Sequence, residues 1–197
     1  MPSLAQLWMS GVREDLAQLL LEKSYREGHF KLASGKESDY YFDCRVTALS
    51  AVGAYLIGLE FNALLNNDDI KGVAGMTMGA DPLVTATSLL SRFRRNGFLD
   101  ALYVRKEPKD HGTGKQVEGM DNFKPGDRIA VLEDVVTTGG SLLKAVKALE
   151  KEGLVVVRCC AILDRQEGGA DNIRNAGYDF SAIFTRESLL STGKYRR

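Results

Sequence analysis

Between residues 72 and 184, short apolar segments alternate with helical patterns, and this order limits the possible folds more than any other feature. The apolar segments predict strands at 72–75, 100–104, 128–132, 154–163 and 180–184. The spacing of apolar residues between several of them predicts helices at 82–95, 141–152 and 170–176. Such alternation gives right-handed crossover units in a mainly parallel sheet with helices on both faces. We therefore predict an α/β fold that binds ligands beyond the carboxyl ends of its strands.

The part of the chain before residue 72 predicts elements of a different kind. Apolar residues at helical spacing predict amphipathic helices over residues 12–25 and 48–65. Residues 30–42 predict a hairpin whose turn is Ser34-Gly35-Lys36 and whose return strand is aromatic. Because 197 residues suffice for one full core, we expect a single domain over residues 1–197.

Composition excludes several classes of protein. The chain has 26 basic and 26 acidic residues, and a dedicated nucleic-acid binder usually has a basic excess, so we expect no nucleic-acid partner. No apolar run reaches the length of a membrane span, and we expect no membrane partner. The three cysteines lack Cys-x-x-Cys spacing, which indicates neither a disulfide framework nor a zinc site. With no secretory signal pattern at the first residues, a reducing, cytoplasmic location is expected.

Residues 129–141, Ile-Ala-Val-Leu-Glu-Asp-Val-Val-Thr-Thr-Gly-Gly-Ser, combine an apolar strand with two acids and a glycine-bearing turn. The N–H groups of such a turn and of a helix N-terminus bind phosphate. Paired carboxylates beside a buried strand need hydroxyls or cations to offset the free energy of burial. Alternatively, Glu133 and Asp134 only cap the next helix, for which one Asp would suffice. We interpret the segment as a site for a phosphorylated sugar.

Residues 105–122 form a long polar segment, and a loop of this length in a compact domain is usually functional or disordered. Four basic or titratable side chains gather in it, namely Arg105, Lys106, Lys109 and His111. A solvated charged loop is the alternative reading. Preorganised cations would assist the departure of a highly charged leaving group, and a mobile lid would exclude water. The segment therefore predicts leaving-group chemistry.

Residues 129–141 resemble the 5-phosphoribosyl-1-diphosphate (PRPP) signature of type I phosphoribosyltransferases. The run Arg-Lys-Glu-Pro-Lys-Asp-His-Gly at 105–112 resembles the catalytic loop of the orotate phosphoribosyltransferase family. This resemblance implies the type I phosphoribosyltransferase fold, with a mainly parallel sheet flanked by helices and a small N-terminal hood at about residues 1–47. It also implies a homodimer in which the mobile catalytic loop, about 105–122, reaches the neighbouring subunit's site. Mg²⁺ would be held mainly by PRPP, with no direct protein ligand.

The resemblance also implies a role for each matching residue. Lys106, Lys109 and His111 would be catalytic, and Glu133 and Asp134 would hold the ribose hydroxyls. The PRPP-binding set would be Arg105, Lys106, Lys109, His111, Glu133, Asp134, Val135, Val136, Thr137, Thr138, Gly139, Gly140, Ser141, Thr77 and Met78. The orotate-binding set would be Thr137, Arg165, Tyr41 and Phe42.

Three positions depart from the family pattern. Several relatives have Asp where this chain has Glu133, and some have a Tyr-Lys pair where it has Thr77 and Met78. Many bacterial relatives have Lys where it has Ala33. The longer Glu133 side chain should change reach rather than role, and backbone N–H groups would replace the missing lysine beside Thr77.

The activity implied by the resemblance is the transfer of the phosphoribosyl group of PRPP to orotate, which yields orotidine 5-monophosphate and pyrophosphate. Two alternatives remain. One is a type I phosphoribosyltransferase for a purine or another pyrimidine, which would not need a carboxylate partner such as Arg165. The other is a regulator that senses PRPP, although the zero net charge and the lack of a helix-turn-helix pattern argue against it.

Overall fold

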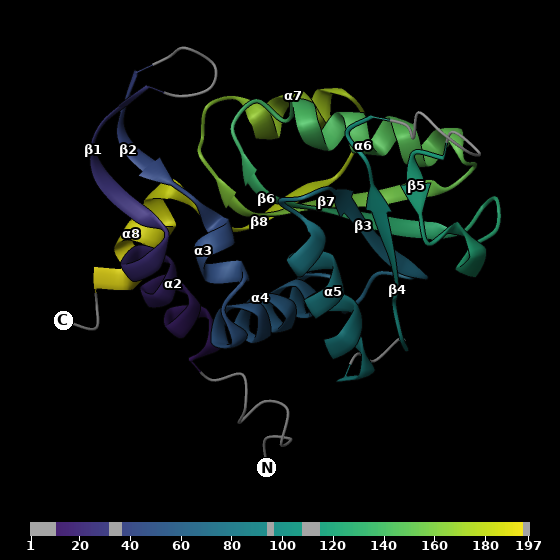
Figure 1. Cartoon of the computed structure of the whole chain (residues 1–197), viewed down its shortest axis with the longest axis horizontal. Helices are drawn as coiled ribbons and strands as arrows, with labels where there is room; N and C mark the ends of the chain where they lie inside the picture. The colour runs from purple at the N-terminus through teal and green to yellow at the C-terminus, as the bar shows by residue number, and fades with distance from the viewer. Residues whose placement is uncertain (1–10, 32–36, 94–96, 108–114, 195–197) are drawn as a thin grey trace.

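The computed structural model describes residues 11–31, 37–93, 97–107 and 115–194. A six-stranded sheet with the strand order β5-β4-β3-β6-β7-β8 forms its centre (Figure 1). Its strands are β3 (Gly72–Met76), β4 (Asp100–Val104), β5 (Val117–Glu118), β6 (Arg128–Val136), β7 (Val155–Asp164) and β8 (Phe180–Thr185). All neighbouring pairs are parallel except β4 and β5. The predicted α/β fold with a mainly parallel sheet is thus confirmed.

Helices cover both faces of this sheet, as the alternating pattern predicts. The pair α6 (Gly140–Lys151) and α7 (Gly169–Asn175) lies on one face, and α4 (Ala51–Leu64) and α5 (Asp81–Leu90) lie on the other (Figure 1). Alternate strand residues supply the two cores: Val73 and Ala130 belong to the cluster that includes Phe61 of α4. Their neighbours Ala74 and Val131 belong to the cluster that includes Val146 of α6.

The remaining elements form a smaller unit at one end of the sheet. They are α2 (Val12–Lys23), the hairpin β1 (Tyr25–Lys31) and β2 (Glu37–Phe42), α3 (Cys44–Ala48) and α8 (Arg186–Lys194). Figure 1 shows the hairpin beside α8, beyond the end of the sheet. The predicted hairpin is confirmed as an antiparallel pair, and its predicted turn at Ser34-Gly35-Lys36 lies outside the described residues.

Several boundaries differ from the sequence predictions. Strand β6 runs to Val136 because its ladder with β7 continues to the pair Val136 and Asp164. The predicted helix at 48–65 is interrupted, since the Ser50 hydroxyl accepts a hydrogen bond from Gly53 N at 3.2 Å and starts α4 there. The segment 105–122 contains the short strand β5 and a 3-10 turn, η2 (Met120–Asn122), in its described part. Helix α8 was not predicted, and another 3-10 turn, η1 (Ser91–Phe93), ends α5.

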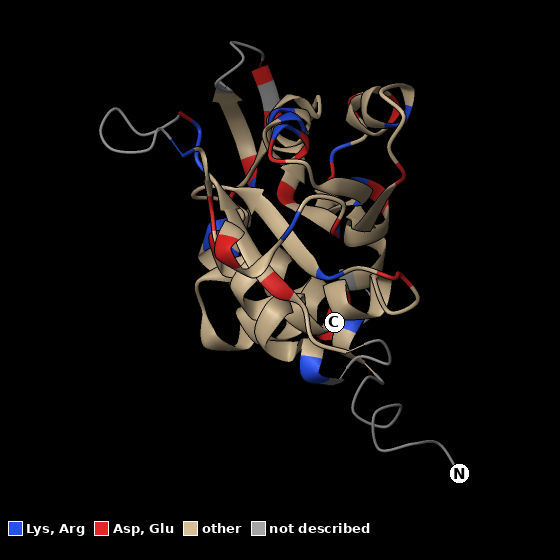
Figure 2. Ribbon diagram, turned by 90° about the vertical axis from the view of Figure 1, so that its right-hand side faces the viewer, with Lys and Arg blue, Asp and Glu red and all other residues tan. Residues whose placement is uncertain are grey.

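Charged side chains of both signs are spread over the described surface. Figure 2 shows Lys and Arg segments interspersed with Asp and Glu segments on the side that it views. Within the described ranges, none of the helices has both the length and the apolar content needed to cross a membrane.

Candidate active site

The carboxyl ends of three parallel strands bring the predicted site segments together. Strand β6 lies between β3 and β7, with Leu132 paired to Gly75 and Val136 paired to Asp164. The loop that holds Thr77 and Met78, the turn after β6, and Arg165 after β7 therefore begin at one edge of the sheet. Segments that are about 90 residues apart, such as Thr77 and Arg165, meet at this edge, where ligands bind in sheets of this type.

The turn from β6 into α6 forms a small pocket. Gly139 precedes α6 with a φ of 80°, a left-handed conformation that side chains other than glycine's rarely adopt. No side chain caps α6, so the interpretation that the acids only cap this helix is wrong. The pocket has a volume of about 100 Å³ and is lined by Glu133, Val135, Val136, Thr137, Thr138, Gly139, Gly140, Ser141 and Leu142. An uncapped helix N-terminus in a pocket can bind an anion.

The two acids lie within β6 rather than after it. Glu133 is 7% exposed, whereas Asp134 is partly buried. Backbone N–H groups donate to both carboxylates, from Asp134 to Glu133 Oε1 at 3.2 Å and from Val135 to Asp134 Oδ1 at 2.8 Å. Burial, together with the neighbouring Asp134 charge, raises the pKa of Glu133 well above its usual value. A ligand hydroxyl or a cation beside this carboxyl would therefore stabilise its charged form.

The loop between β3 and α5 lies against these acids. The peptide bond between Thr77 and Met78 is cis, and Thr77 N donates to Val104 O at 2.8 Å. A Cβ atom on Gly79 would lie 3.2 Å from Oδ2 of Asp134, so this loop and β6 are in close contact. Burial raises the pKa of Asp81, whose Oδ1 atom has no hydrogen-bond partner among the described residues.

The predicted basic loop is only partly described. Lys109 and His111 lie outside the described residues. Lys106 is exposed, and its positive charge slightly lowers the pKa of Glu133 against the larger effect of burial. Arg105 instead forms an ion pair with Glu118, with 2.9 Å between Nε and Oε1.

The base of this loop is closed by hydrogen bonds between its two sides. Arg105 N donates to Gln116 O at 2.8 Å, and the Gln116 side-chain amide donates to Arg105 O at 3.1 Å. Next to this pair, Val104 of β4 pairs with Val117 of β5. The loop therefore leaves the sheet and returns to it at one place.

Arg165 lies at the other end of the site, directly after β7. Its N–H donates to Val136 O at 3.0 Å, which keeps it beside the end of β6. The side chain is buried, and its Nε donates to Glu167 Oε1 at 2.8 Å. Its guanidinium carbon lies 4.5 Å from the centre of the Tyr40 ring. Arg165 thus has both an acidic partner, Glu167, and an aromatic partner, Tyr40.

The two aromatic residues predicted to bind orotate do not come together. Phe42 is buried in the core, and Tyr41 is 39% exposed and packs on Phe30 with 5.5 Å between ring centres. Neighbouring strand residues point to opposite faces, which separates this pair. The aromatic ring beside Arg165 is that of Tyr40, which shares the inward face with Phe42. The sequence could have indicated this, because residues two apart in a strand share a face and Tyr40 stands two residues before Phe42.

Comparisons with known proteins agree with this arrangement. The family model described as "Phosphoribosyl transferase domain" matches residues 58–178. The chain is 49% identical over 179 residues to the orotate phosphoribosyltransferase of Sorangium cellulosum, which covers 90% of this chain and 93% of that protein. It superposes with a TM-score of 0.78 on the Mycobacterium tuberculosis orotate phosphoribosyltransferase in complex with Fe(III) dicitrate, at 35% identity over 90% of this chain and 98% of that one. The same Mycobacterium enzyme in complex with PRPP gives a TM-score of 0.73 at 31% identity, again over 90% and 98% of the two chains.

Proposed function

Since the chain belongs to the orotate phosphoribosyltransferase family, we propose that the edge formed by β3, β6 and β7 is its active site. The enzyme is a pentosyltransferase of pyrimidine biosynthesis. It transfers the phosphoribosyl group of PRPP to orotate and yields orotidine 5-monophosphate and pyrophosphate. The observation that carries the site assignment is the meeting of the acids, the glycine turn and Arg165 at one edge of the sheet.

The turn after β6 would hold the phosphorylated ribose of PRPP. Its pocket, lined by Thr137 to Ser141 and open to the uncapped start of α6, suits the 5-phosphate. Asp134 and Glu133 would accept hydrogen bonds from the ribose hydroxyls. The raised pKa of Glu133 supports this assignment, because a buried carboxyl of this kind is stabilised when donors reach it. The backbone at Thr77 and Met78 would face the diphosphate.

Magnesium would be bound mainly through PRPP. Among the residues that the structure describes, no group of three or more His, Cys, Asp or Glu side chains could hold a metal ion. Mg²⁺ commonly keeps several waters and is bound by one or two carboxylates together with substrate phosphates. Asp134 and Glu133, which are assigned to the ribose hydroxyls, would then need no direct bond to the ion. When bound, the ion would neutralise charge on the leaving pyrophosphate.

Arg165 would bind the carboxylate of orotate. A planar guanidinium matches a carboxylate in charge and in shape, and the hydrogen bond to Glu167 fixes one edge of it. Thr137, at the start of the phosphate turn, would lie between the two substrates. This arrangement would hold the acceptor nitrogen near the ribose carbon from which pyrophosphate departs.

Catalysis would consist of positioning and electrostatic stabilisation, without a covalent enzyme intermediate. Positive charge develops on the ribosyl ring as the bond to pyrophosphate breaks, and the acids of β6 lie beside that ring. Lys106, whose charge lowers the pKa of Glu133, would act on the leaving group. By resemblance, Lys109 and His111 of the same loop would join it. We further propose that the chain works as one domain in the cytoplasm.

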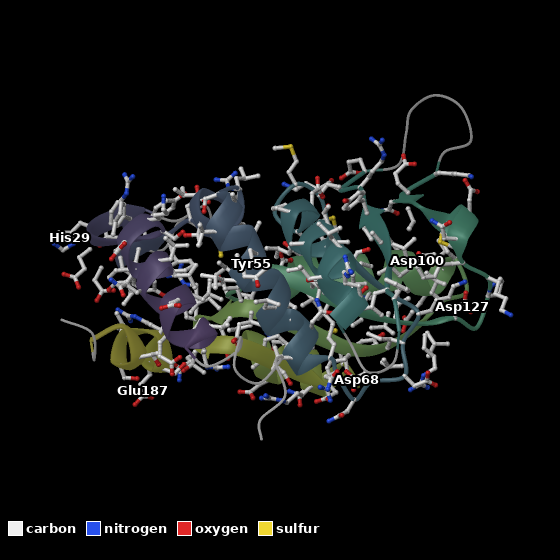
Figure 3. The ribbon with its side chains drawn as sticks, turned by 90° about the horizontal axis from the view of Figure 1, so that it is seen from below. His29, Tyr55, Asp68, Asp100, Asp127 and Glu187 are labelled. Atoms are coloured by element: carbon white, nitrogen blue, oxygen red, sulfur yellow. The ribbon has the colours of Figure 1, made fainter. Side chains whose placement is uncertain are left out.

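The enzyme would act as a homodimer that shares its catalytic loop across the interface. Four large apolar side chains of α3, α4 and the turn between them support this, because they are open to solvent in the single chain: Val46 at 48%, Leu49 at 75%, Val52 at 62% and Tyr55 at 41% exposure. Figure 3 labels Tyr55 on the side of α4 that it views. Large apolar side chains gathered on a protein surface commonly mark an interface.

A spectrophotometric assay tests the proposed function. Orotate absorbance should fall when PRPP and Mg²⁺ are added, and the absorbance of uracil or hypoxanthine should not change in the same mixture. Asp134→Asn should remove most of the activity, and Asp121→Asn, which neutralises an exposed acid on η2, should not. Consumption of uracil or hypoxanthine at the rate of orotate would overturn the proposal.

A further inference from the structure

The Tyr40 ring has two guanidinium groups over it. Tyr40 is 2% exposed, and the guanidinium carbons of Arg165 and Arg186 lie 4.5 and 4.1 Å from its ring centre. Arg165 directly follows β7 and Arg186 begins α8, so three segments that are distant in sequence meet at this ring. Attraction between a cation and an aromatic face strengthens when water is excluded. The ring is therefore an energetic partner for both arginines.

The charges around this ring are balanced. Arg165 pairs with Glu167 at 2.8 Å, and Arg186 pairs with Asp39 at 3.2 Å. Each of the two positive charges is thus paired with a negative charge. The affinity of Arg165 for a carboxylate then depends on the direction in which its guanidinium presents its N–H groups. Whatever fixes that direction will affect affinity for the anion.

Helix α8 and the end of β7 are held together by a second set of contacts. Gln166 has a φ of 60°, its N–H donates to Asp164 Oδ1 at 2.9 Å, and its side-chain oxygen accepts from Glu187 N at 3.2 Å. Tyr25 stacks on Tyr40 with 5.6 Å between ring centres. In Figure 3, the labelled His29 of β1 and Glu187 of α8 mark the end of the molecule where the hairpin and α8 lie.

We propose that Tyr40 is a positioning residue for the acceptor: its ring, steadied by Arg186 of α8, sets the orientation in which Arg165 meets the carboxylate of orotate. The inference rests on the proposed role of Arg165. It assigns a specificity function to two residues that do not themselves touch the substrate. It also predicts that changes in α8 alter affinity for orotate and leave the PRPP half of the site unaffected.

The first test compares Tyr40→Leu with Tyr40→Phe. Loss of the ring should raise the KM for orotate roughly tenfold, the size of a well-desolvated cation–aromatic contact. Phe keeps the ring face and should restore the KM to within about twofold of the wild type. The KM for PRPP and kcat should change little in both variants. An equal rise of both KM values would show a merely structural role and overturn the inference.

The second test uses Arg186, which is accessible enough to be replaced without opening the core. Arg186→Gln should raise the KM for orotate about threefold, as expected for a partly exposed contact. Arg174→Gln is the matched control and should leave both KM values unchanged, because Arg174 of α7 lies 5.8 Å from the centre of a different ring, that of Phe180 in β8. An unchanged KM for orotate in Arg186→Gln would contradict the steadying role.

Failure of this inference can be distinguished from failure of the proposed function. If Arg165→Lys leaves the KM for orotate unchanged, the assignment of Arg165 itself is wrong. If Arg165→Lys raises that KM while Tyr40→Leu and Arg186→Gln do not, only the positioning inference is wrong.

Discussion

Gly79 and Asp134 are so close that a Cβ atom on the glycine would lie 3.2 Å from Oδ2 of the carboxylate. Gly79 belongs to the loop after β3, and Asp134 belongs to β6. Contacts this tight leave only a few tenths of an ångström for adjustment. The position of Asp134, the acid proposed to bind ribose, is therefore coupled to the loop proposed to face the diphosphate.

Replacing Gly79 by Ala tests this coupling. The added methyl group should displace the Asp134 carboxylate, and small misplacements at a reacting centre lower rates strongly. We expect kcat/KM for PRPP to fall roughly tenfold, with the KM for orotate unchanged. Steady-state kinetics measure both, and thermal melting checks that the fold survives. Wild-type kinetics with PRPP would show that the contact has no functional consequence.

Neutralising Glu133 should stabilise the unliganded protein while removing activity. Burial raises the pKa of Glu133 in the folded state above its pKa in the unfolded chain. The folded protein is therefore most stable, as far as this group is concerned, at pH values below the unfolded-state pKa, and it loses that stability as the pH rises through the folded-state pKa. Glu133→Gln removes that loss. Its melting temperature should exceed that of the wild type by several degrees at about pH 8, and the difference should shrink toward about pH 4.

Asp100→Asn is the control for this prediction, because Asp100 is an exposed acid at the start of β4 (Figure 3). Its melting temperature should follow the wild type at both pH values. A difference between Glu133→Gln and the wild type that does not vary with pH would refute burial as the source of the effect.

Lys109→Ala tests the catalytic loop. If Lys109 stabilises the departing pyrophosphate, kcat should fall by about 10²–10³-fold while the KM for orotate changes little. Lys115→Ala removes another lysine of the same segment, one that is exposed and has no assigned role, and should be nearly silent. Equal effects of the two substitutions would mean that the loop contributes only general positive charge.

Leu49→Glu should separate the proposed homodimer. Leu49 is 75% exposed in the single chain, and a charge buried at this place in an interface would oppose association. Light scattering should report monomers, and specific activity should fall on dilution. Leu89→Glu is the matched control on α5, where the leucine is 72% exposed, and should remain dimeric.

Mixing two inactive variants tests the shared site directly. Lys109→Ala and Asp134→Asn should complement each other, because a heterodimer holds one site with an intact loop and intact acids. If activity does not recover although the subunits have been shown to exchange, each complete site lies within one chain.

The strands and covering helices could be predicted from sequence because their apolar periodicities are strong and local. The end of β6 could not, since acids rarely continue a buried strand, and only pairing with β7 as far as Asp164 keeps Glu133 and Asp134 in the ladder. The PRPP segment was recognisable because its residues are contiguous. The surroundings of Arg165 were not, because Tyr40 and Arg186 reach it from 125 residues before and 21 residues after.

The hydrogen bonds between Arg105 and Gln116 hold the two ends of the proposed catalytic loop together at one place. The free energy of closing such a loop depends weakly on its length, at about 0.6 kcal/mol for each doubling. Evolution or design can therefore lengthen or shorten the segment between these two residues with little effect on folding. Changes at Arg105 or Gln116 themselves would instead alter the place on the sheet where the segment begins and ends.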